Sequence, residues 1–138
     1  MKISVLGMGY VGLSNAIMLS TKYDVICHDI DESKLESIKK RKSPIKDKLI
    51  SEFFKNKKLK LKTLNKINSE ISQSDFIIIS TPTNFQTSTN MFDTNSIDKI
   101  LKTLSKMKST SIIIIKSTLP VGYTARVNIR SVSYTHLT

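Results

Sequence analysis

Glycine, proline and cysteine are scarce in this chain, whose 138 residues include four Gly, three Pro and one Cys. An average chain of this length would hold about ten Gly and about seven Pro. This scarcity excludes collagen-like and linker-like chains, and the single cysteine excludes a disulfide scaffold. Because Cys27 cannot form an internal disulfide, we expect a reducing compartment and a cytoplasmic protein.

Long apolar runs are also absent. The longest ones, at 76–79 and 112–115, are far shorter than the about 20 apolar residues that a membrane helix needs, so we expect no membrane partner. The apolar stretch 3–19 resembles a signal peptide only superficially. It contains three glycines and Asn15, and no small-residue cleavage site follows it.

Charge of one sign dominates, since 22 Lys and Arg against 11 Asp and Glu give a net charge of +11. Nucleic acid is one class of partner for such a chain. However, the lysines are spread along most of the sequence, only three residues are Arg, and no aromatic residues alternate with the basic ones. We therefore favour solvated basic surfaces and expect no nucleic-acid partner.

The apolar residues form short continuous runs and helical patterns that alternate along the chain. Runs such as 75–80 and 111–116 are typical of strands buried on both faces of a parallel sheet. Apolar residues three and four positions apart, as across 96–107, indicate amphipathic helices. We predict strands at 2–6, 24–28, 58–62, 75–80 and 111–116, and helices at 10–21, 32–41, 47–56, 65–71 and 96–107.

This alternation predicts an α/β fold, a Rossmann-type doubly wound parallel sheet of strand order 3-2-1-4-5, incomplete at the C-terminus. Residues 58–62 alternate Lys and Leu, and lysines discourage unwanted pairing, so we place this strand at an edge. Residues 126–138 show no helical pattern. They contain two Arg and no Lys, whereas residues 1–125 contain nineteen Lys and one Arg.

Residues 7–12 read Gly-Met-Gly-Tyr-Val-Gly and match G-x-G-x-x-G between the first predicted strand and helix. In that setting the pattern is a dinucleotide-binding fingerprint rather than a chance structural turn. Gly7 permits the tight turn, Gly9 lets a pyrophosphate approach the backbone, and Gly12 lets the helix pack on the strand. The N–H groups at the helix start, including those of Tyr10 and Val11, would face the phosphates.

The fingerprint also requires an acidic residue about 20 positions further on. Asp29 lies 22 residues after Gly7, at the end of the second predicted strand. Its carboxylate would accept hydrogen bonds from the adenosine ribose and repel a 2′-phosphate. The sequence therefore predicts NAD, rather than NADP, as the cofactor.

In a sheet of order 3-2-1-4-5, the cofactor crevice lies between the first and fourth strands. The loop 80–84 leaves the fourth strand opposite the glycine turn. Its residues Thr81, Pro82 and Thr83 can contact a nicotinamide ribose or substrate, and ordinary turn chemistry explains them equally well. Thr118 follows the fifth strand, at the sheet edge where active residues gather.

Two residues of the second strand also invite attention. Cys27 lies inside a predicted buried strand, where a thiol is inert, so we interpret it as a core residue. His28 would lie near the adenosine, but nothing in the sequence assigns it a role. We expect no metal site.

Taken together, the motifs resemble the UDP-glucose/GDP-mannose dehydrogenase family of nucleotide-sugar dehydrogenases, specifically its bacterial branch that oxidises UDP-glucose. The resemblance covers about residues 1–125, in family order and at family-like spacing. The matching segments are 2–14, Asp29-Ile30 with Lys34, Ser43-Pro44-Ile45, Thr81-Pro82-Thr83-Asn84, Thr89-Asn90, Phe92-Asp93-Thr94 and 115–122.

The resemblance implies that C6 of UDP-glucose is oxidised to the carboxylate of UDP-glucuronate, a polysaccharide precursor, with two NAD. It implies that Asp29 and Lys34 hold the adenosine ribose, that Thr83 contacts NAD, and that Thr118 is catalytic, positioning water near C6. Lys34 is otherwise an ordinary lysine of a helix surface. A homodimer is implied for the full-length protein.

The family's nucleophilic cysteine and its nucleotide-sugar domain lie downstream of any residue in this chain. We therefore expect a truncated chain, inactive alone, with an NAD-binding domain at 1–125 and a disordered or artefactual tail foreign to the family at 126–138. Two alternatives remain open. One is a dehydrogenase for GDP-mannose or a UDP-N-acetylhexosamine, and the other is a standalone NAD-sensing module.

Overall fold

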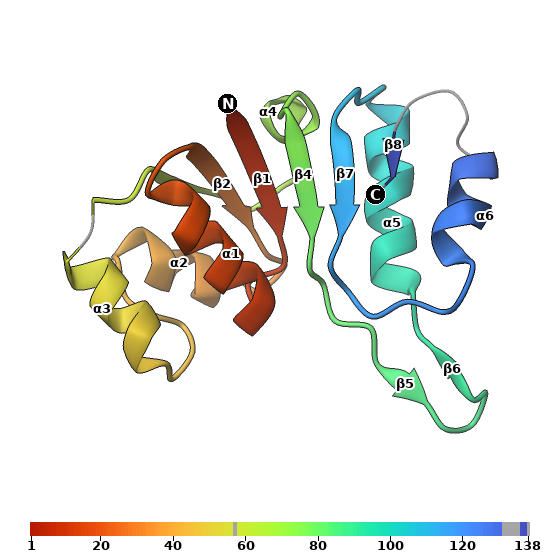
Figure 1. Ribbon diagram of the computed structural model, residues 1–138, viewed down its shortest axis with the longest axis horizontal. Helices are drawn as coiled ribbons and strands as arrows, with labels where there is room; N and C mark the ends of the chain where they lie inside the picture. Colours follow the sequence, from red (N-terminus) through yellow and green to blue (C-terminus); the bar gives the residue numbers. More distant parts are fainter. Residues whose placement is uncertain (57, 131–135, 138) are drawn as a thin grey trace.

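The computed structural model describes residues 1–56, 58–130 and 136–137, and its elements alternate between strand and helix (Figure 1). The strands of the main sheet are β1 (Lys2–Leu6), β2 (Asp24–His28), β3 (Leu61–Leu64), β4 (Phe76–Ile79), β7 (Ile112–Ile115) and β8 (His136–Leu137). The helices are α1 (Tyr10–Ser20), α2 (Glu32–Lys39), α3 (Lys48–Asn56), α4 (Ser69–Ser72), α5 (Asn95–Lys106) and α6 (Tyr123–Arg130).

The main sheet is parallel and runs in the order β3-β2-β1-β4-β7-β8. The predicted order 3-2-1-4-5 is confirmed, with β7 as the fifth strand of the prediction. The chain moves outward from β1 to β3 and then returns to place β4 on the other side of β1. This reversal creates the switch point where α/β sheets bind ligands.

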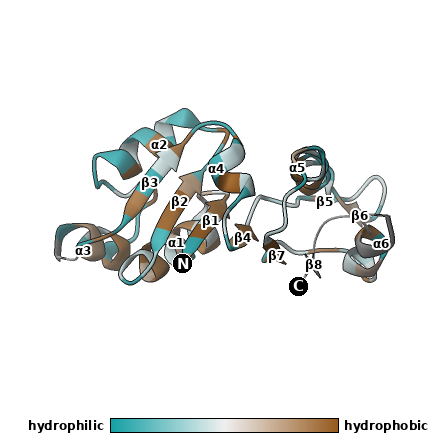
Figure 2. Ribbon diagram, turned by 90° about the horizontal axis from the view of Figure 1, so that it is seen from above, coloured by the Kyte–Doolittle hydropathy of each residue, from teal (hydrophilic) through white to brown (hydrophobic). Residues whose placement is uncertain are grey.

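Apolar residues cover both faces of the sheet. In β1, Ile3 and Val5 belong to the core beneath α1, α2 and α3, whereas Leu6 belongs to the core beneath α4, α5 and α6. In β4, Ile78 faces the first core and Ile77 the second. Figure 2 shows these apolar strands between the helices, with hydrophilic residues on the outer side of α2. Burial on both faces explains why the strands lack polar alternation.

Side-chain caps fix where the outer helices begin. Asp31 Oδ1 accepts a hydrogen bond from the Ser33 amide at 3.0 Å and so caps the start of α2. Asp47 Oδ1 accepts one from the Ile50 amide at 2.9 Å, at the start of α3. Each cap satisfies a backbone donor that the helix itself cannot.

The third strand lies further along the chain than predicted, at Leu61–Leu64 rather than 58–62. In the parallel pairing of β2 with β3, the first residue of β3 is Leu61, which lies opposite Val25. The amide of Lys60 donates instead to the Ser20 carbonyl at the end of α1, at 2.9 Å. The predicted position at the sheet edge is confirmed.

The fourth helix is also shorter than the predicted 65–71, because α4 spans only Ser69–Ser72. Asn68 lies just before it, and its Oδ1 accepts a hydrogen bond from the Ile71 amide at 3.1 Å. This cap begins the helix four residues later than the apolar pattern indicated.

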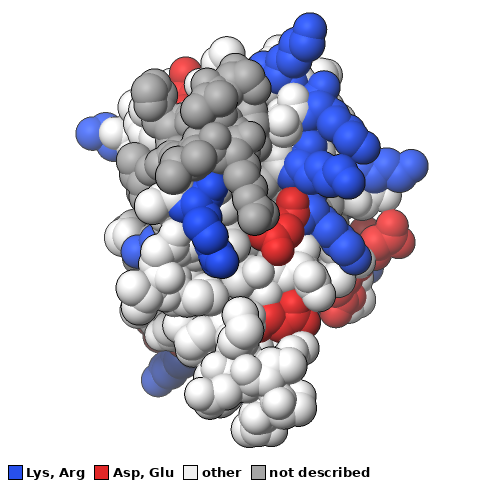
Figure 3. Space-filling model, turned by 90° about the vertical axis from the view of Figure 1, so that its right-hand side faces the viewer, with Lys and Arg blue, Asp and Glu red and all other residues white. Residues whose placement is uncertain are grey.

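A hairpin that the sequence analysis missed follows β4. Its strands are β5 (Phe85–Gln86) and β6 (Met91–Phe92), which pair antiparallel. The rings of Phe85 and Phe92 meet edge to face with centroids 5.2 Å apart. The arm projects from the sheet in Figure 1. It contains no charged residue between 81 and 92, and Figure 3 shows it as an uncharged protrusion below a face with Lys and Arg.

Helix α6 contradicts the expectation that residues after 125 lack a helical pattern, at least for 126–130. Its first residue, Tyr123, is buried and donates a hydroxyl hydrogen bond to Asp98 of α5. The guanidinium of Arg126 lies 5.8 Å from the centre of the Tyr123 ring. Residues 131–135 and 138 lie outside the described residues, so the boundary at 125 and the foreign tail stay predictions.

Membrane-spanning length is not reached by any helix within the described part of the chain, since none is both long and apolar enough.

Candidate functional site

The glycine turn connects β1 to α1 at the switch point, and two of its glycines are required by close packing. Gly7 has φ of 101°, and a Cβ there would lie 2.7 Å from the Ser80 carbonyl oxygen. A Cβ on Gly12 would lie only 1.8 Å from the Gly7 carbonyl oxygen. These contacts bring β1, α1 and the end of β4 together more closely than any other residue type allows.

Gly9 differs from its neighbours because it faces open space. It is the N-cap of α1, and a Cβ built on it would meet no atom within 4 Å. The first backbone bond of the helix runs from the Leu13 amide to the Gly9 carbonyl at 2.9 Å, so the preceding amides of the first turn have no partner within the helix. The side chains of Tyr10 and Val11 are exposed, which leaves their backbone N–H groups as the useful donors.

Asp29 joins the turn to the second strand. Its Oδ2 accepts a hydrogen bond from the Met8 amide at 2.7 Å, and its Oδ1 accepts one from the Asp31 amide at 2.8 Å. Each carboxylate oxygen has two acceptor positions, so both oxygens can still accept from a ligand. The half-buried carboxylate is therefore oriented before any ligand arrives.

The two loops on the far side of the crevice are hydrogen-bonded to each other. The Ser117 hydroxyl donates to the Thr81 carbonyl at 2.6 Å, and the Thr83 hydroxyl donates to the Thr118 carbonyl at 2.6 Å. The Thr118 side chain itself is exposed. The structure thus brings the predicted residues Thr81, Thr83 and Thr118 together at one end of the sheet.

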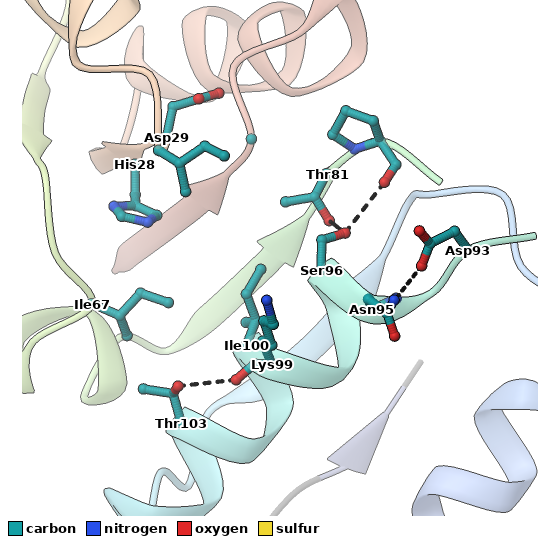
Figure 4. A pocket seen from close by; sticks show the side chains of 13 residues that line it. His28, Asp29, Ile67, Thr81, Asp93, Asn95, Ser96, Lys99, Ile100 and Thr103 are labelled. Atoms are coloured by element: carbon teal, nitrogen blue, oxygen red, sulfur yellow. Dashed lines mark hydrogen bonds between the residues drawn. The ribbon is translucent and has the colours of Figure 1, made fainter. Parts of the chain in front are cut away.

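A pocket of about 500 Å³ opens beside this crevice (Figure 4). The ends of β1 and β2 and the loop after β4 supply part of its lining, namely Gly7, His28, Asp29, Ile30, Thr81 and Pro82. The remaining lining residues are Ile67, Asp93, Asn95, Ser96, Lys99, Ile100 and Thr103, most of them from α5. An apolar pocket with a few polar groups is typical of a small-molecule site.

The sequence analysis missed the contribution of α5. Ser96, Lys99, Ile100 and Thr103 recur three and four positions apart on a helix that was predicted, so they lie on one face. This spacing was visible in the sequence, but only the fold shows that this face lines the same pocket as Asp29. Lys34, predicted to contact the ribose, is half-buried on α2 and does not line the pocket.

The residues present fit a dinucleotide. The open space at Gly9 and the unpaired amides of α1 suit a phosphate, and Asp29 suits a ribose diol. The buried Ser80 hydroxyl, beside Gly12, has no hydrogen-bond partner among the described residues.

Catalysis by a cysteine nucleophile and binding of a metal ion have less support at this site. Burial raises the pKa of the Cys27 thiol to about 12, although the charge of Arg41 acts in the opposite direction, so this thiol is no nucleophile. Among the described residues, no group of three or more His, Cys, Asp or Glu side chains could hold a metal ion.

Known proteins resemble this chain over most of its length. The model of the UDP-glucose/GDP-mannose dehydrogenase family, NAD binding domain, matches residues 1–136. UDP-glucose 6-dehydrogenase of Campylobacter jejuni is 47% identical over 126 residues, covering 90% of this chain and 32% of that protein. The Streptococcus pneumoniae UDP-glucose 6-dehydrogenase is 42% identical over 127 residues, covering 92% and 32%. The chain spans about one third of the length of these relatives.

Solved structures of related dehydrogenases share the fold. The UDP-D-ManNAc dehydrogenase of Pyrococcus horikoshii superposes with a TM-score of 0.80 at 28% identity, over 94% of this chain and 31% of that one. The GDP-mannose dehydrogenase of Pseudomonas aeruginosa gives 0.83 at 20% identity, over 99% and 35%. With its glycine turn, its oriented Asp29 and a family match over nearly its whole length, the chain belongs to the UDP-glucose/GDP-mannose dehydrogenase family, as its NAD-binding domain.

Proposed function

We propose that this chain is the NAD-binding part of a dehydrogenase that oxidises the C6 hydroxymethyl group of UDP-glucose to the carboxylate of UDP-glucuronate. The change removes four electrons, and each bound NAD supplies one two-electron hydride acceptor, so two NAD are consumed. The observation that carries the proposal is the Asp29 carboxylate, which is hydrogen-bonded to the glycine turn at the switch point of the sheet.

The proposed binding roles follow the site. The backbone of Gly7, Gly9 and Gly12, with the amides of Tyr10 and Val11, would surround the pyrophosphate. Asp29 would hold the adenosine ribose, and Lys34 would assist it by family likeness. The remaining proposed contacts to the cofactor, on the opposite side of the crevice, are Thr81, Pro82, Thr83 and Thr118.

Thr118 has a second proposed role, because it lies at the carboxyl end of β7 with an exposed side chain. There its hydroxyl would hydrogen-bond near the reacting C6 and position water. The hydrogen bond from Thr83 to the Thr118 carbonyl would hold that loop in place.

The chain alone should bind NAD without oxidising the sugar. Covalent chemistry of the kind the family resemblance implies needs an accessible thiol, and the single cysteine, Cys27, lies buried in β2 with a raised pKa. The nucleotide-sugar substrate and a homodimer are proposed for the longer protein, as is a cytoplasmic location.

UDP-glucose is favoured among the nucleotide sugars because the relatives from Campylobacter jejuni and Streptococcus pneumoniae are named UDP-glucose 6-dehydrogenase. GDP-mannose and UDP-N-acetylhexosamines are the alternatives, since solved structures of similar fold are named for them. A standalone NAD-sensing module is the candidate of a different class.

The test is an assay of NADH formation with UDP-glucose, GDP-mannose and UDP-N-acetylmannosamine. We expect the chain alone to bind NAD and to form no NADH with any sugar. We expect the genomic DNA beyond codon 125 to encode, in the same frame, a glycine-rich segment that contains a cysteine. We expect the longer protein encoded there to form NADH fastest with UDP-glucose. An authentic stop codon together with NAD binding would favour the sensing module, and turnover by the chain alone would contradict the proposal.

A further inference from the structure

His28 is the last residue of β2 and is 8% exposed, yet it lines the pocket next to Asp29. Its Nδ1 lies 2.9 Å from the carbonyl oxygen of Leu64 on the neighbouring strand β3. A carbonyl oxygen only accepts hydrogen bonds, so Nδ1 must carry the proton. In a neutral imidazole this leaves Nε2 as an acceptor. The backbone of β3 therefore selects one tautomer of His28.

The pocket around this ring suits a flat apolar group. Ile67 lies on one side of the His28 ring and Ile100 lies across the pocket from it (Figure 4). Ile30, directly after Asp29, adds an apolar side chain to the lining. A ligand whose ribose is held by Asp29 would place its base in this space. In the described part of the chain, the His28 side chain makes no hydrogen bond other than the one to Leu64.

We propose that Nε2 of His28 accepts a hydrogen bond from the 6-amino group of adenine, so that His28 makes the site specific for an adenine dinucleotide. The inference rests on the proposed NAD binding and adds a residue that reads the base. Hypoxanthine carries a carbonyl oxygen where adenine has the amino group. That oxygen cannot donate a hydrogen bond. In the tautomer that the Leu64 carbonyl selects, Nε2 of His28 is also an acceptor, so two acceptors would face each other.

The test compares NAD with nicotinamide hypoxanthine dinucleotide, which differs from it only in the base. Binding of each dinucleotide to the wild-type chain is measured by calorimetry. We expect the hypoxanthine dinucleotide to bind about tenfold more weakly, since a buried acceptor loses its donor. Equal affinities would overturn the assignment of His28 while leaving NAD binding intact.

Two variants separate base reading from a merely structural role. In His28→Asn the side-chain amide can still donate to the Leu64 carbonyl, but no acceptor remains at the Nε2 position. We expect this variant to bind NAD about tenfold more weakly and to lose the discrimination between the two dinucleotides. Asp24→Asn changes an exposed acid at the other end of β2, outside the lining of this pocket, and should keep the discrimination.

The proposal stays falsifiable even if His28→Asn fails to fold, because equal binding of the two dinucleotides by the wild-type chain would overturn it. If the wild-type chain binds neither dinucleotide, the proposed function itself is wrong. If His28→Asn folds and still discriminates, another group reads the base and the proposal is overturned.

Discussion

The carbonyl oxygen of Gly7 lies 1.8 Å from the point where a Cβ on Gly12 would stand. Gly9, between them, has no atom within 4 Å of its own Cβ position. One short turn therefore contains a glycine that the fold requires and a glycine that the fold does not require. The free space at Gly9 is the space that a phosphate would use.

This contrast predicts opposite effects of the same substitution on stability. Gly12→Ala forces a methyl group into the Gly7 backbone, so we expect it to lower the free energy of unfolding by at least about 2 kcal/mol. Gly9→Ala meets nothing and should change it by no more than about 1 kcal/mol, the scale of an N-cap change. Urea denaturation followed by circular dichroism measures both. Equal stability of the two variants would show that the turn is packed differently.

Asp29 is expected to set the choice between NAD and NADP. Its carboxylate can accept from ribose hydroxyls and repels a 2′-phosphate, so the wild-type chain should prefer NAD by at least about tenfold. Asp29→Asn keeps the size of the side chain and removes its charge, and should reduce that preference. The measurement is calorimetric titration with each dinucleotide.

The control for this experiment is Asp24→Asn, which changes an exposed acid at the opposite end of the same strand. It should leave the preference for NAD unchanged. A preference that survives in Asp29→Asn, or is lost in Asp24→Asn, would show that Asp29 does not select the cofactor.

Cys27 is expected to be unreactive in the folded chain. Burial raises its pKa from 9.0 to about 12, so below pH 9 almost no thiolate forms in the native state. A thiol reagent at pH 8 should modify it only through unfolding, at a rate that rises steeply with urea. Stability should also fall as the pH rises above 9, where the unfolded thiol ionises and the folded one does not. In Cys27→Ala this part of the alkaline loss should be absent.

The ion pair of Glu70 should make stability fall at low pH, whereas Cys27 should make it fall at high pH. The Lys62 ammonium donates to both of its oxygens, at 2.8 and 3.0 Å, and this lowers the pKa of Glu70 below its ordinary value of 4.5. The stabilisation is therefore present above pH 4.5 and is lost as the pH falls through the lowered pKa. The pair is solvent-exposed, so the effect should be small and screened by salt.

The matching variant is Glu70→Gln, compared with wild type by thermal melting at neutral pH and near pH 3. We expect a lower midpoint only at neutral pH and only at low salt. Glu52→Gln, at an exposed acid of α3, should show no such pattern. A difference that persists near pH 3 would assign the role of Glu70 to packing rather than charge.

Local patterns predicted β1, β2, β4 and β7 well because these strands are mainly apolar runs, whereas the strand with alternating Lys and Leu was placed three residues too early. The runs ending at Leu6 and Ile79 can be recognised from their own residues, and the order of strands follows from the doubly wound fold that the alternation of strands and helices indicates. The glycine turn and Asp29 were found for the same reason, since their spacing is fixed by a single β-α-β unit.

The features that sequence did not predict depend on contacts between distant segments. The strands of the hairpin at Phe85–Gln86 and Met91–Phe92 are two residues long, too short for any period to show. Helix α6 begins at Tyr123, which is hydrogen-bonded to Asp98 of another helix. His28 gained its role only once β3 placed the Leu64 carbonyl beside its ring.

Calorimetric titration of NAD into the 138-residue chain tests the central claim most directly, with Gly9→Ala measured beside the wild type. The account predicts saturable one-to-one binding to the wild-type chain. It predicts binding at least about tenfold weaker to Gly9→Ala, because the added methyl occupies the space that the pyrophosphate needs. Absence of binding to a folded wild-type chain, or equal binding to Gly9→Ala, would contradict the assignment of this crevice to NAD.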